Sequence, residues 1–338
     1  MAFITLNKNN FFNNLDIIRN RTKTKDKIAL VLKDNAYGHG LLEIASMAKE
    51  YGITKAVVRT SAEAKIVEEF FEYILVLADS PQEKNEKIRY TINDINTIKN
   101  FPKKTRVELK VDTGMHRNGI AMSELEIAFE IMKKQELRLE AVFTHHGCAD
   151  ELNEFFDMQN RNFDEVKRSS EALAERYGFD ELRFHSCNSA ALFRTSSFDE
   201  DMARVGIAAY GCMQLPSEFD EKSLKPVLSF FANKISSRGL KKGESVGYGA
   251  TYTAEEDCVV GSYDFGYGDG FLRVCSNNYT TPQNIKLLGR ISMDNSSFLS
   301  DEDELLIFND ARVVAEVAGT IGYEVLTSLK SDIKRELV

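Results

Sequence analysis

The chain has 338 residues, of which 43% are hydrophobic and 28% are charged, and its formal net charge at pH 7 is −9. This composition is typical of a folded globular protein, and the length favours one large α/β unit plus a smaller domain. The acidic balance argues against a nucleic-acid partner, because binding to a phosphate backbone relies on a dense basic surface.

The N-terminal sequence and the cysteines indicate the cellular compartment of the protein. The opening MAFITLNKNN lacks the basic and then apolar pattern of a secretory signal, and no apolar run approaches the roughly 18 residues of a membrane-spanning helix. We therefore expect a cytoplasmic protein with no membrane partner. Five cysteines, with no C-x-x-C pair among them, predict reduced and mostly buried thiols rather than disulfides or a zinc site.

Eight short, β-rich apolar runs recur at residues 28–33, 55–60, 73–79, 89–94, 106–112, 139–145, 182–188 and 203–211. Between several of them apolar residues follow a helical spacing, as in residues 41–51 and 123–135. This alternation predicts an α/β fold with a (β/α)8 TIM-like barrel. An open doubly wound sheet is the alternative, although no G-x-G-x-x-G motif follows the first run.

After Pro226 the pattern changes to strand-like runs broken by Gly, Asn and Asp, with helical periodicity only near the end. We therefore predict a barrel domain over residues 1–222 and a C-terminal β-rich domain over residues 223–338. The opening residues 1–10 are expected to add a strand to the β-rich domain before the chain enters the barrel.

Unusual polar residues gather where the predicted strands end, which is the face of a barrel that carries catalytic groups. They are Lys33 after the first run, Lys110 and Arg117 around the fifth, His145 and His146 after the sixth, His185 and Ser189 around the seventh, and Arg204 on the eighth. Their convergence predicts an active site at one mouth of the barrel.

Lys33 follows the apolar run ALVL, so its amine is expected at the rim of the barrel core, where partial desolvation disfavours the ammonium form. Such an amine is a nucleophile suited to a Schiff base with an aldehyde cofactor. The plainer interpretation is a strand-end lysine whose stem packs on apolar neighbours while its amine reaches solvent.

The eighth run, ARVGIAAYG, places Gly206 and Gly211 beside free backbone amides. The loops after strands seven and eight are the usual phosphate site of this fold, and helix N-termini favour an anion. Ser189 can add a hydroxyl from the adjacent strand. These residues predict a phosphate site.

Eight segments in order, VLKDNAYGHG, LKVDTGMHRNGI, FTHHGCADE, FHSCNSAAL, ARVGIAAYG, VGYGATY, DFGYGDG and LLGRISMDNSS, resemble the alanine racemase family from residue 31 to residue 298. The resemblance implies an isomerase (EC 5.1.1.1) that uses pyridoxal 5′-phosphate (PLP) to interconvert L- and D-alanine, supplying D-alanine for peptidoglycan. It also implies a homodimer with shared active sites, each completed by the partner's second domain.

The resemblance assigns the two catalytic bases to Lys33, which would also hold PLP as a Schiff base, and Tyr267, which would arrive from the other subunit. Two bases on opposite faces explain racemisation, because one removes the α-proton and the other returns a proton from the far side.

The family's arginine facing the pyridine nitrogen corresponds to Arg204, a cation that keeps its proton and so leaves that nitrogen neutral. His145 and His185 correspond to the histidines that form a hydrogen-bond network with it and reach toward Tyr267, a network expected to lower the tyrosine pKa. The resemblance also has Arg117 contact the PLP phenolic oxygen and the substrate carboxylate, and Lys110 match a frequently carbamylated lysine that supports this arginine.

Further cofactor contacts are carried over to Tyr37, Asn188, Ser189, Gly206 and Ile207. Gly38 and Gly40 would permit the turn that brings Tyr37 to the phosphate. The partner would contribute Met293, whose backbone amide meets the substrate carboxylate, with Asp294 beside it, and Tyr248 in the access corridor. No metal is implied.

Two features depart from the family pattern. The chain ends SLKSDIKRELV, without the tyrosine that contacts the phosphate, so we expect one phosphate ligand fewer and looser PLP retention. Gly268 replaces an expected alanine, which would loosen the loop that holds Tyr267.

Four alternatives remain open at this stage. The first is a PLP racemase of another small amino acid such as serine. A PLP decarboxylase would normally present a carboxylate in place of Arg204, and a PLP-carrier protein would lack the second domain. A metal-dependent barrel hydrolase would use His145, His146, His185 and a carbamylated Lys110 as ligands.

Overall fold

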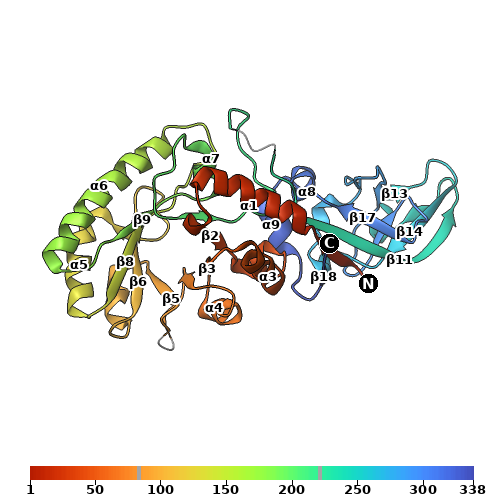
Figure 1. The fold of residues 1–338 in the computed structure, drawn as a ribbon. Helices are drawn as coiled ribbons and strands as arrows, with labels where there is room; N and C mark the ends of the chain where they lie inside the picture. The colour runs from red at the N-terminus through yellow and green to blue at the C-terminus, as the bar shows by residue number, and fades with distance from the viewer. Residues whose placement is uncertain (82–84, 220–222) are drawn as a thin grey trace.

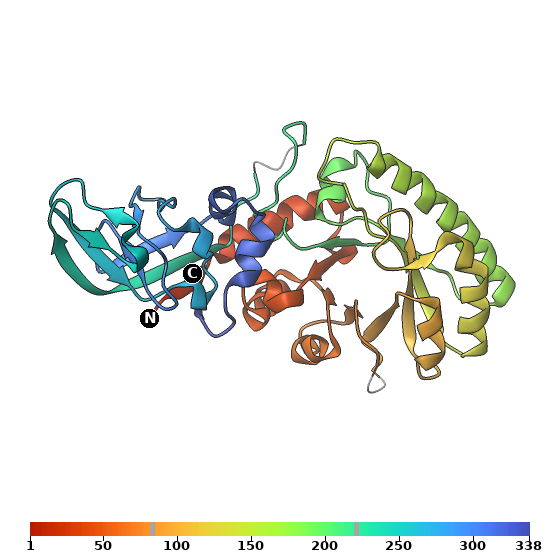
Figure 2. The ribbon, with the colours of Figure 1, turned by 180° about the vertical axis from the view of Figure 1, so that it is seen from behind.

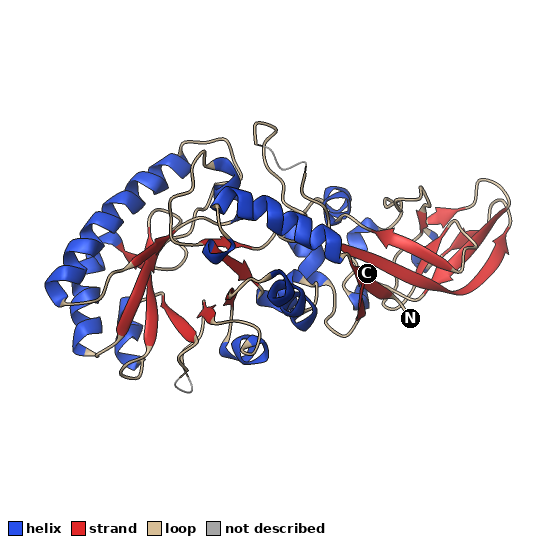
Figure 3. Ribbon diagram, in the orientation of Figure 1, coloured by secondary structure: helices blue, strands red, loops and turns tan. Residues whose placement is uncertain are grey.

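The computed structural model describes residues 1–81, 85–219 and 223–338. A barrel-shaped part and a mostly stranded part lie side by side, and the long helix α1 (Lys8–Thr22) bridges toward both (Figures 1 and 3). Both chain ends lie in the stranded part (Figure 2).

The barrel-shaped part confirms the eight predicted strands. Parallel strands pair in the order β10-β2-β3-β4-β5-β6-β8-β9 within the described chain. Their bounds are β2 (Ile28–Val31), β3 (Lys55–Val58), β4 (Tyr73–Val76), β5 (Ile88–Ile92), β6 (Arg106–Asp112), β8 (Arg138–Phe143), β9 (Arg183–His185) and β10 (Ala203–Val205). The amide of Arg204 donates to the Cys187 carbonyl at 2.9 Å, which links the last strands and nearly closes the barrel.

Helices cover the outside of this barrel (Figure 1). They are α3 (Leu41–Tyr51), α4 (Ser61–Val67), α5 (Leu125–Lys134), α6 (Phe155–Tyr177) and α7 (Ser189–Arg194). The amphipathic patterns at residues 41–51 and 123–135 correspond to α3 and α5, whose apolar faces are buried. The short strand β7 (Ile120–Ala121) pairs with β6 at the end of the strand.

The second part is the expected β-rich unit, and the α-helices among its described residues lie near the end. Its strands are β1 (Phe3–Leu6), β11 (Leu228–Leu240), β12 (Ser245–Val246), β13 (Tyr252–Thr253), β14 (Cys258–Tyr263), β15 (Leu287–Leu288), β16 (Ser296–Phe298), β17 (Glu304–Phe308) and β18 (Lys334–Leu337). Its helices are α8 (Ala311–Ala318) and α9 (Gly322–Ser328). The strand expected from the opening residues is β1, which lies between β11 and β18.

The two parts are tied together around the chain that joins them. Asn14 of α1 is fully buried, and its side-chain amide donates to the carbonyls of Ala209 at 3.0 Å and Lys225 at 2.8 Å. Its oxygen accepts from the Lys225 amide at 2.8 Å. A single hydrophobic cluster also runs from the barrel into the β-rich part. These contacts fix α1 against the linker.

The first strand ends earlier than the sequence suggested. β2 stops at Val31, and Lys33 opens a short segment, α2 (Lys33–Tyr37), that winds left-handed: Asp34, Asn35, Ala36 and Tyr37 have φ of 54°, 55°, 52° and 52°. The turn was expected to depend on Gly38 and Gly40, yet most of it consists of residues with a Cβ. Each such residue costs about 1–2 kcal/mol in this conformation.

Tertiary contacts hold this left-handed turn in place. The amide of Asp34 donates to Glu63 at 2.8 Å, and the amide of Leu41 donates to the Asn35 side chain at 2.9 Å. From β18, the guanidinium of Arg335 donates to the Gly38 carbonyl at 2.8 Å. The strained turn therefore depends on both parts of the molecule.

Gly38→Ala should destabilise the protein far more than Gly319→Ala. Both glycines have positive φ, of +76° and +67°, but a Cβ on Gly38 would lie 1.9 Å from the Leu326 carbonyl oxygen, whereas Gly319 has no neighbour within 4 Å. We expect Gly319→Ala to lower the free energy of unfolding by about 1 kcal/mol and Gly38→Ala by about 3 kcal/mol or more. Urea denaturation of both variants measures this, and equal losses would contradict the close approach of α9 to the turn.

Candidate active site

A cavity of about 550 Å³ opens at the carboxyl ends of the barrel strands, next to α9. Eleven of the residues singled out from the sequence line it: Lys33, Tyr37, Lys110, Arg117, His145, His146, Asn188, Ser189, Arg204, Gly206 and Ile207. The structure thus brings together residues that are far apart in the chain.

Lys33 lies in the wall of this cavity, but the structure does not desolvate it as expected. Its side chain is 37% exposed, and its amine lies 3.4 Å from the Asp34 carboxylate. The left-handed turn starts at Lys33 and returns the chain so that Tyr37 lines the same cavity. The amine is accessible to a ligand in the cavity.

Ser189, Gly206 and Tyr37 form a compact cradle at the ends of β9 and β10. The Ser189 hydroxyl accepts from the amides of Gly206 at 3.1 Å and Ala208 at 3.3 Å. A Cβ on Gly206 would lie 2.8 Å from the Tyr37 hydroxyl oxygen, so a side chain at this position would have to displace the Tyr37 ring. Asn188 caps α7, accepting from the Ala191 amide at 2.9 Å. Hydroxyls and backbone amides at a helix start suit an anion.

Arg204 is a buried cation at the floor of the cavity, 5% exposed. Its Nη2 donates to the carbonyls of Thr144 at 2.7 Å and Ser186 at 3.1 Å. Its Nη1 donates to the carbonyl of His185 at 3.1 Å and also to the ring Nδ1 of His185. Both terminal nitrogens are thus occupied by protein, and the guanidinium is held rigidly.

The two histidines expected around Arg204 differ in their contacts. His185 lies beneath Arg204, fully buried, and bonds to it directly. His145 lines the cavity, and the described residues give it no hydrogen bond to Arg204. Burial, followed by the charges of Arg204 and Lys110, holds the pKa of His145 well below its usual value, so its ring is neutral.

Lys110 is buried beside the other cations of the site. Burial, followed by the neighbouring charges of Arg117 and Arg204, lowers the pKa of its amine to about 8. Lys33, Lys110, Arg117 and Arg204 all line one cavity, which makes it strongly cationic. Such a cavity favours ligands with several negative charges.

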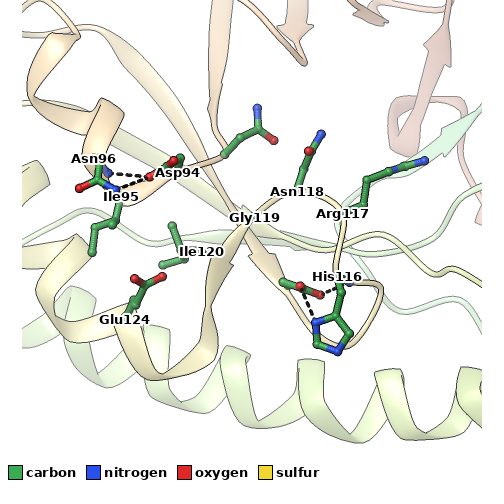
Figure 4. Close-up of a pocket in the computed structure, with 11 residues that line it drawn as sticks. Asp94, Ile95, Asn96, His116, Arg117, Asn118, Gly119, Ile120 and Glu124 are labelled. Atoms are coloured by element: carbon green, nitrogen blue, oxygen red, sulfur yellow. Dashed lines mark hydrogen bonds and ion pairs between the residues drawn. The ribbon is translucent and has the colours of Figure 1, made fainter.

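Arg117 lies on a loop that follows β6, and Asp112 organises that loop. The Asp112 carboxylate accepts from the amides of Gly114 at 2.9 Å and His116 at 3.1 Å, and lies 3.2 Å from the His116 ring. In Figure 4, which shows a neighbouring recess, Arg117 points away from His116. The turn therefore sends Arg117 toward the main cavity while His116 stays with Asp112.

The residues expected from the second domain do not line this cavity. Tyr248, Tyr267 and Met293 lie on the β-rich part with 68%, 42% and 55% of their surface exposed, and Asp294 follows Met293. The amide of Tyr267 donates to the Ser292 carbonyl at 3.0 Å, so these loops pack together.

Gly268 tightens the Tyr267 loop, contrary to the expected loosening. Its amide donates to the Met293 carbonyl at 2.8 Å, and a Cβ on Gly268 would lie 2.7 Å from that oxygen. The absence of a side chain permits this close contact.

The expectation that the C-terminal region brings no tyrosine to the site is wrong. Tyr323 of α9 lines the cavity, with its ring centroid 5.8 Å from that of Tyr37. Tyr323 stands in GYEVL, shortly before the last residues from which this expectation was drawn. Glu108 was not predicted either, although the charged period-two pattern R-x-E-x-K-x-D of β6 was a signal for it.

Within residues 1–81, 85–219 and 223–338, no group of three or more His, Cys, Asp and Glu side chains is placed to hold a metal ion, and all five cysteines are unpaired. The same residues include no helix long and apolar enough to span a membrane.

Comparison with known proteins agrees with this geometry. Residues 6–214 match the family described as alanine racemase, N-terminal domain, and residues 227–337 match alanine racemase, C-terminal domain. An alanine racemase of Nitratiruptor sp. is 43% identical, covering 99% of each chain, and one of Campylobacter jejuni is 38% identical over the full length of both.

Solved structures are similar as well. The alanine racemase of Clostridium difficile 630 superposes with a TM-score of 0.88 at 25% identity, covering 100% of this chain and 95% of that one. The alanine racemase of Bacillus anthracis with bound L-Ala-P has a TM-score of 0.87 at 26% identity, with the same coverage. The chain therefore belongs to the alanine racemase family of PLP-dependent isomerases.

Proposed function

We propose that this protein interconverts L- and D-alanine with PLP, using Lys33 and Tyr267 as its two bases. The observation that carries the proposal is the single cavity in which Lys33, the Ser189–Gly206 cradle and Arg204 meet at the carboxyl ends of the strands. In a bacterium with a peptidoglycan wall, the product D-alanine would enter that polymer.

The residues of the cavity fit PLP. The cradle of Ser189, Gly206 and Tyr37, with Ile207 beside it, offers donors to a phosphate, and the surrounding cations offset its charge. Lys33 stands at another part of the same wall, where its amine can bind the aldehyde carbon. Tyr323 closes the side formed by α9.

When bound, PLP supplies an electron sink that makes the α-proton of an amino acid acidic. Lys33 would remove or return that proton on one face of the α-carbon. Tyr267 would act on the opposite face, and a base on each face is what inversion of the α-carbon requires.

Arg204 would face the ring nitrogen of PLP through Nε, because Nη1 and Nη2 are bonded to protein groups. A guanidinium keeps its proton, so it donates a hydrogen bond without protonating the ring. This limits how far charge spreads into the ring and so disfavours side reactions.

Arg117 would bind the substrate carboxylate, a planar anion that matches the guanidinium fork. The neutral His145 would leave the positive charge of the cavity to Lys110, Arg117 and Arg204. Met293 would add its backbone amide to the same carboxylate, with Asp294 next to it.

A second copy of the chain would bring Tyr248, Tyr267, Met293 and Asp294 to this cavity. The exposure of the first three on the β-rich part, outside the cavity of their own chain, supports a homodimer with shared sites. We place the domain boundary at residue 222, between the barrel (1–222) and the β-rich domain (223–338), with residues 3–6 paired to the latter.

The direct test is the optical rotation of L-alanine mixed with the purified protein and PLP. We expect decay to zero, and no decay for Lys33→Ala, which also loses the visible absorption of the bound cofactor because the amine that holds it is missing. L-serine at equal concentration serves as the comparison. Faster turnover of serine would overturn the choice of alanine, and full activity of Lys33→Ala would refute the role of Lys33.

Tyr267→Phe should remove one base and keep the cofactor. In deuterated water, exchange of the α-proton should then slow by roughly 100-fold or more for one enantiomer of alanine and remain for the other. Proton NMR of each enantiomer measures this, with the absorption of bound PLP as the control for an intact site. Equal slowing of both enantiomers would contradict the two-face assignment.

Lys110→Met should change stability in a pH-dependent way. The folded pKa of Lys110 is about 8, below the ordinary 10.5, so the unfolded chain binds more protons between these values. Because the folded protein favours the neutral amine, its contribution to the free energy of unfolding is fully present above pH 10.5 and is lost as the pH falls through 8. The total change in this free energy is about 3 kcal/mol. Urea unfolding of wild type and Lys110→Met is measured in CO2-free buffer from pH 7 to 10.5. The free energy of unfolding of wild type should rise relative to that of the variant as the pH increases, and a difference that does not change with pH would contradict the prediction.

A further inference from the structure

Glu108 is a carboxylate buried in the middle of the barrel. β6 sends Arg106, Glu108 and Lys110 to the same side, because alternate residues of a strand share a face. Glu108 has no exposed surface, and a buried charge of this kind is costly unless every lone pair has a partner.

Three donors converge on this carboxylate. Oε2 accepts from His185 Nε2 at 2.9 Å, and Oε1 accepts from Arg183 Nη2 at 2.9 Å and from the Tyr73 hydroxyl. Although burial acts in the opposite direction, these bonds and the charge of Arg183 lower the pKa of Glu108 to about 2. Glu108 is therefore ionised, an acceptor on both oxygens.

The other ring nitrogen of His185, Nδ1, faces Arg204 Nη1. A guanidinium has donors only, so Nδ1 must present a lone pair. A neutral ring then carries its proton on Nε2, where the acceptor-only carboxylate of Glu108 receives it. Burial lowers the pKa of His185, which agrees with a neutral ring.

We infer that Glu108 is a positioning residue that fixes the tautomer of His185 and, through it, the direction in which Arg204 faces the cofactor. The inference rests on the proposed function, in which Arg204 Nε meets the PLP ring nitrogen. With the proton held on Nε2, the Nδ1 lone pair anchors Nη1 and leaves Nε available.

Other charged groups near Arg204 do not share this role. Glu200 accepts from the amides of Ser186 at 2.6 Å and Cys187 at 3.0 Å, so it holds the loop after β9 and not the ring of His185. Glu140 pairs with Arg89 at 2.9 Å and with Arg183 at 3.2 Å, farther from the cavity.

Only a carboxylate can satisfy both neighbours of Glu108. In Glu108→Gln, the amide oxygen can accept from His185 or from Arg183, and the amide nitrogen then opposes a donor on the other side. If the nitrogen faces His185, the imidazole proton moves to Nδ1 and opposes Arg204. The Tyr73 hydroxyl does not favour either orientation of the amide, because a hydroxyl can both donate and accept a hydrogen bond.

The first experiment determines the tautomer in the full-length holoenzyme labelled with ¹⁵N-histidine. The chain has five histidines, and the His185 signal is assigned by its loss in His185→Gln. At neutral pH, the ¹⁵N shifts should show a protonated Nε2 and an unprotonated Nδ1. A proton on Nδ1, or on both nitrogens, would overturn the inference, and this result needs no variant of Glu108.

Three variants separate positioning from a purely structural ion pair. In Glu108→Gln, a population with the proton on Nδ1 should appear, and kcat for alanine should fall roughly tenfold, the loss of about one charge-assisted hydrogen bond. Arg183→Met removes the ion pair but leaves the carboxylate, so the tautomer and kcat should stay near wild type. The double variant frees the amide oxygen for His185 and should restore the Nε2 tautomer.

The outcomes distinguish the two proposals. If Arg183→Met behaves like Glu108→Gln, then Glu108 serves only the ion pair and the inference fails. If wild type leaves L-alanine unchanged while His185 carries its proton on Nε2, the proposed function fails and the tautomer assignment stands.

Discussion

The buried guanidinium of Arg204 is the interaction on which the site depends. A charge this deep requires acceptors on nearly all its donors, and it finds them in the carbonyls of Thr144, Ser186 and His185 and in the His185 ring. Those carbonyls stand at the ends of β8 and β9. The hydrogen bonds of Arg204 therefore require β8 and β9 to lie side by side at their carboxyl ends, next to the cavity.

Part of the barrel interior beneath Arg204 is polar. Beneath Arg204, the layers contain His185 and Glu108, then Arg183 and Glu140, so charges alternate from the cavity toward the opposite mouth. A core of branched apolar side chains is usual for this fold. In this barrel, ion pairs replace part of that apolar core. Each pair stabilises the fold only if the neighbouring charged side chains keep their positions.

Local sequence patterns were sufficient to predict much of the architecture. Runs such as IALVLK and RVELKVD identify buried strands because their apolar or β-branched residues fill a short window, and the polar residues after them identify the mouth of the barrel. The opening strand β1 followed from the same pattern. Conversely, the left-handed turn after Lys33 was not predictable: Asp34 and Asn35 tolerate that conformation singly, but Ala36 and Tyr37 do not, and the run of four is held there by Glu63 and Arg335. Tyr323 was missed for a related reason, since its place in the site depends on how α9 docks.

The two domains contribute different residues to the site, and the contacts around Arg204 explain the difference. The cavity cations and the cradle of Ser189, Gly206 and Tyr37 belong to the barrel, where the parallel strands and the bonds around Arg204 keep them rigid. Among the described residues, the β-rich part contributes Ile321 and Tyr323 to the same wall, and its exposed residues Tyr267 and Met293 share a loop packing that Gly268 makes possible. Tyr267 lies outside the cavity of its own chain, so in the proposed mechanism it would reach the α-carbon, on the side opposite to Lys33, from a second molecule. The position of the two proposed bases on different domains is the geometrical reason to propose that two chains act together.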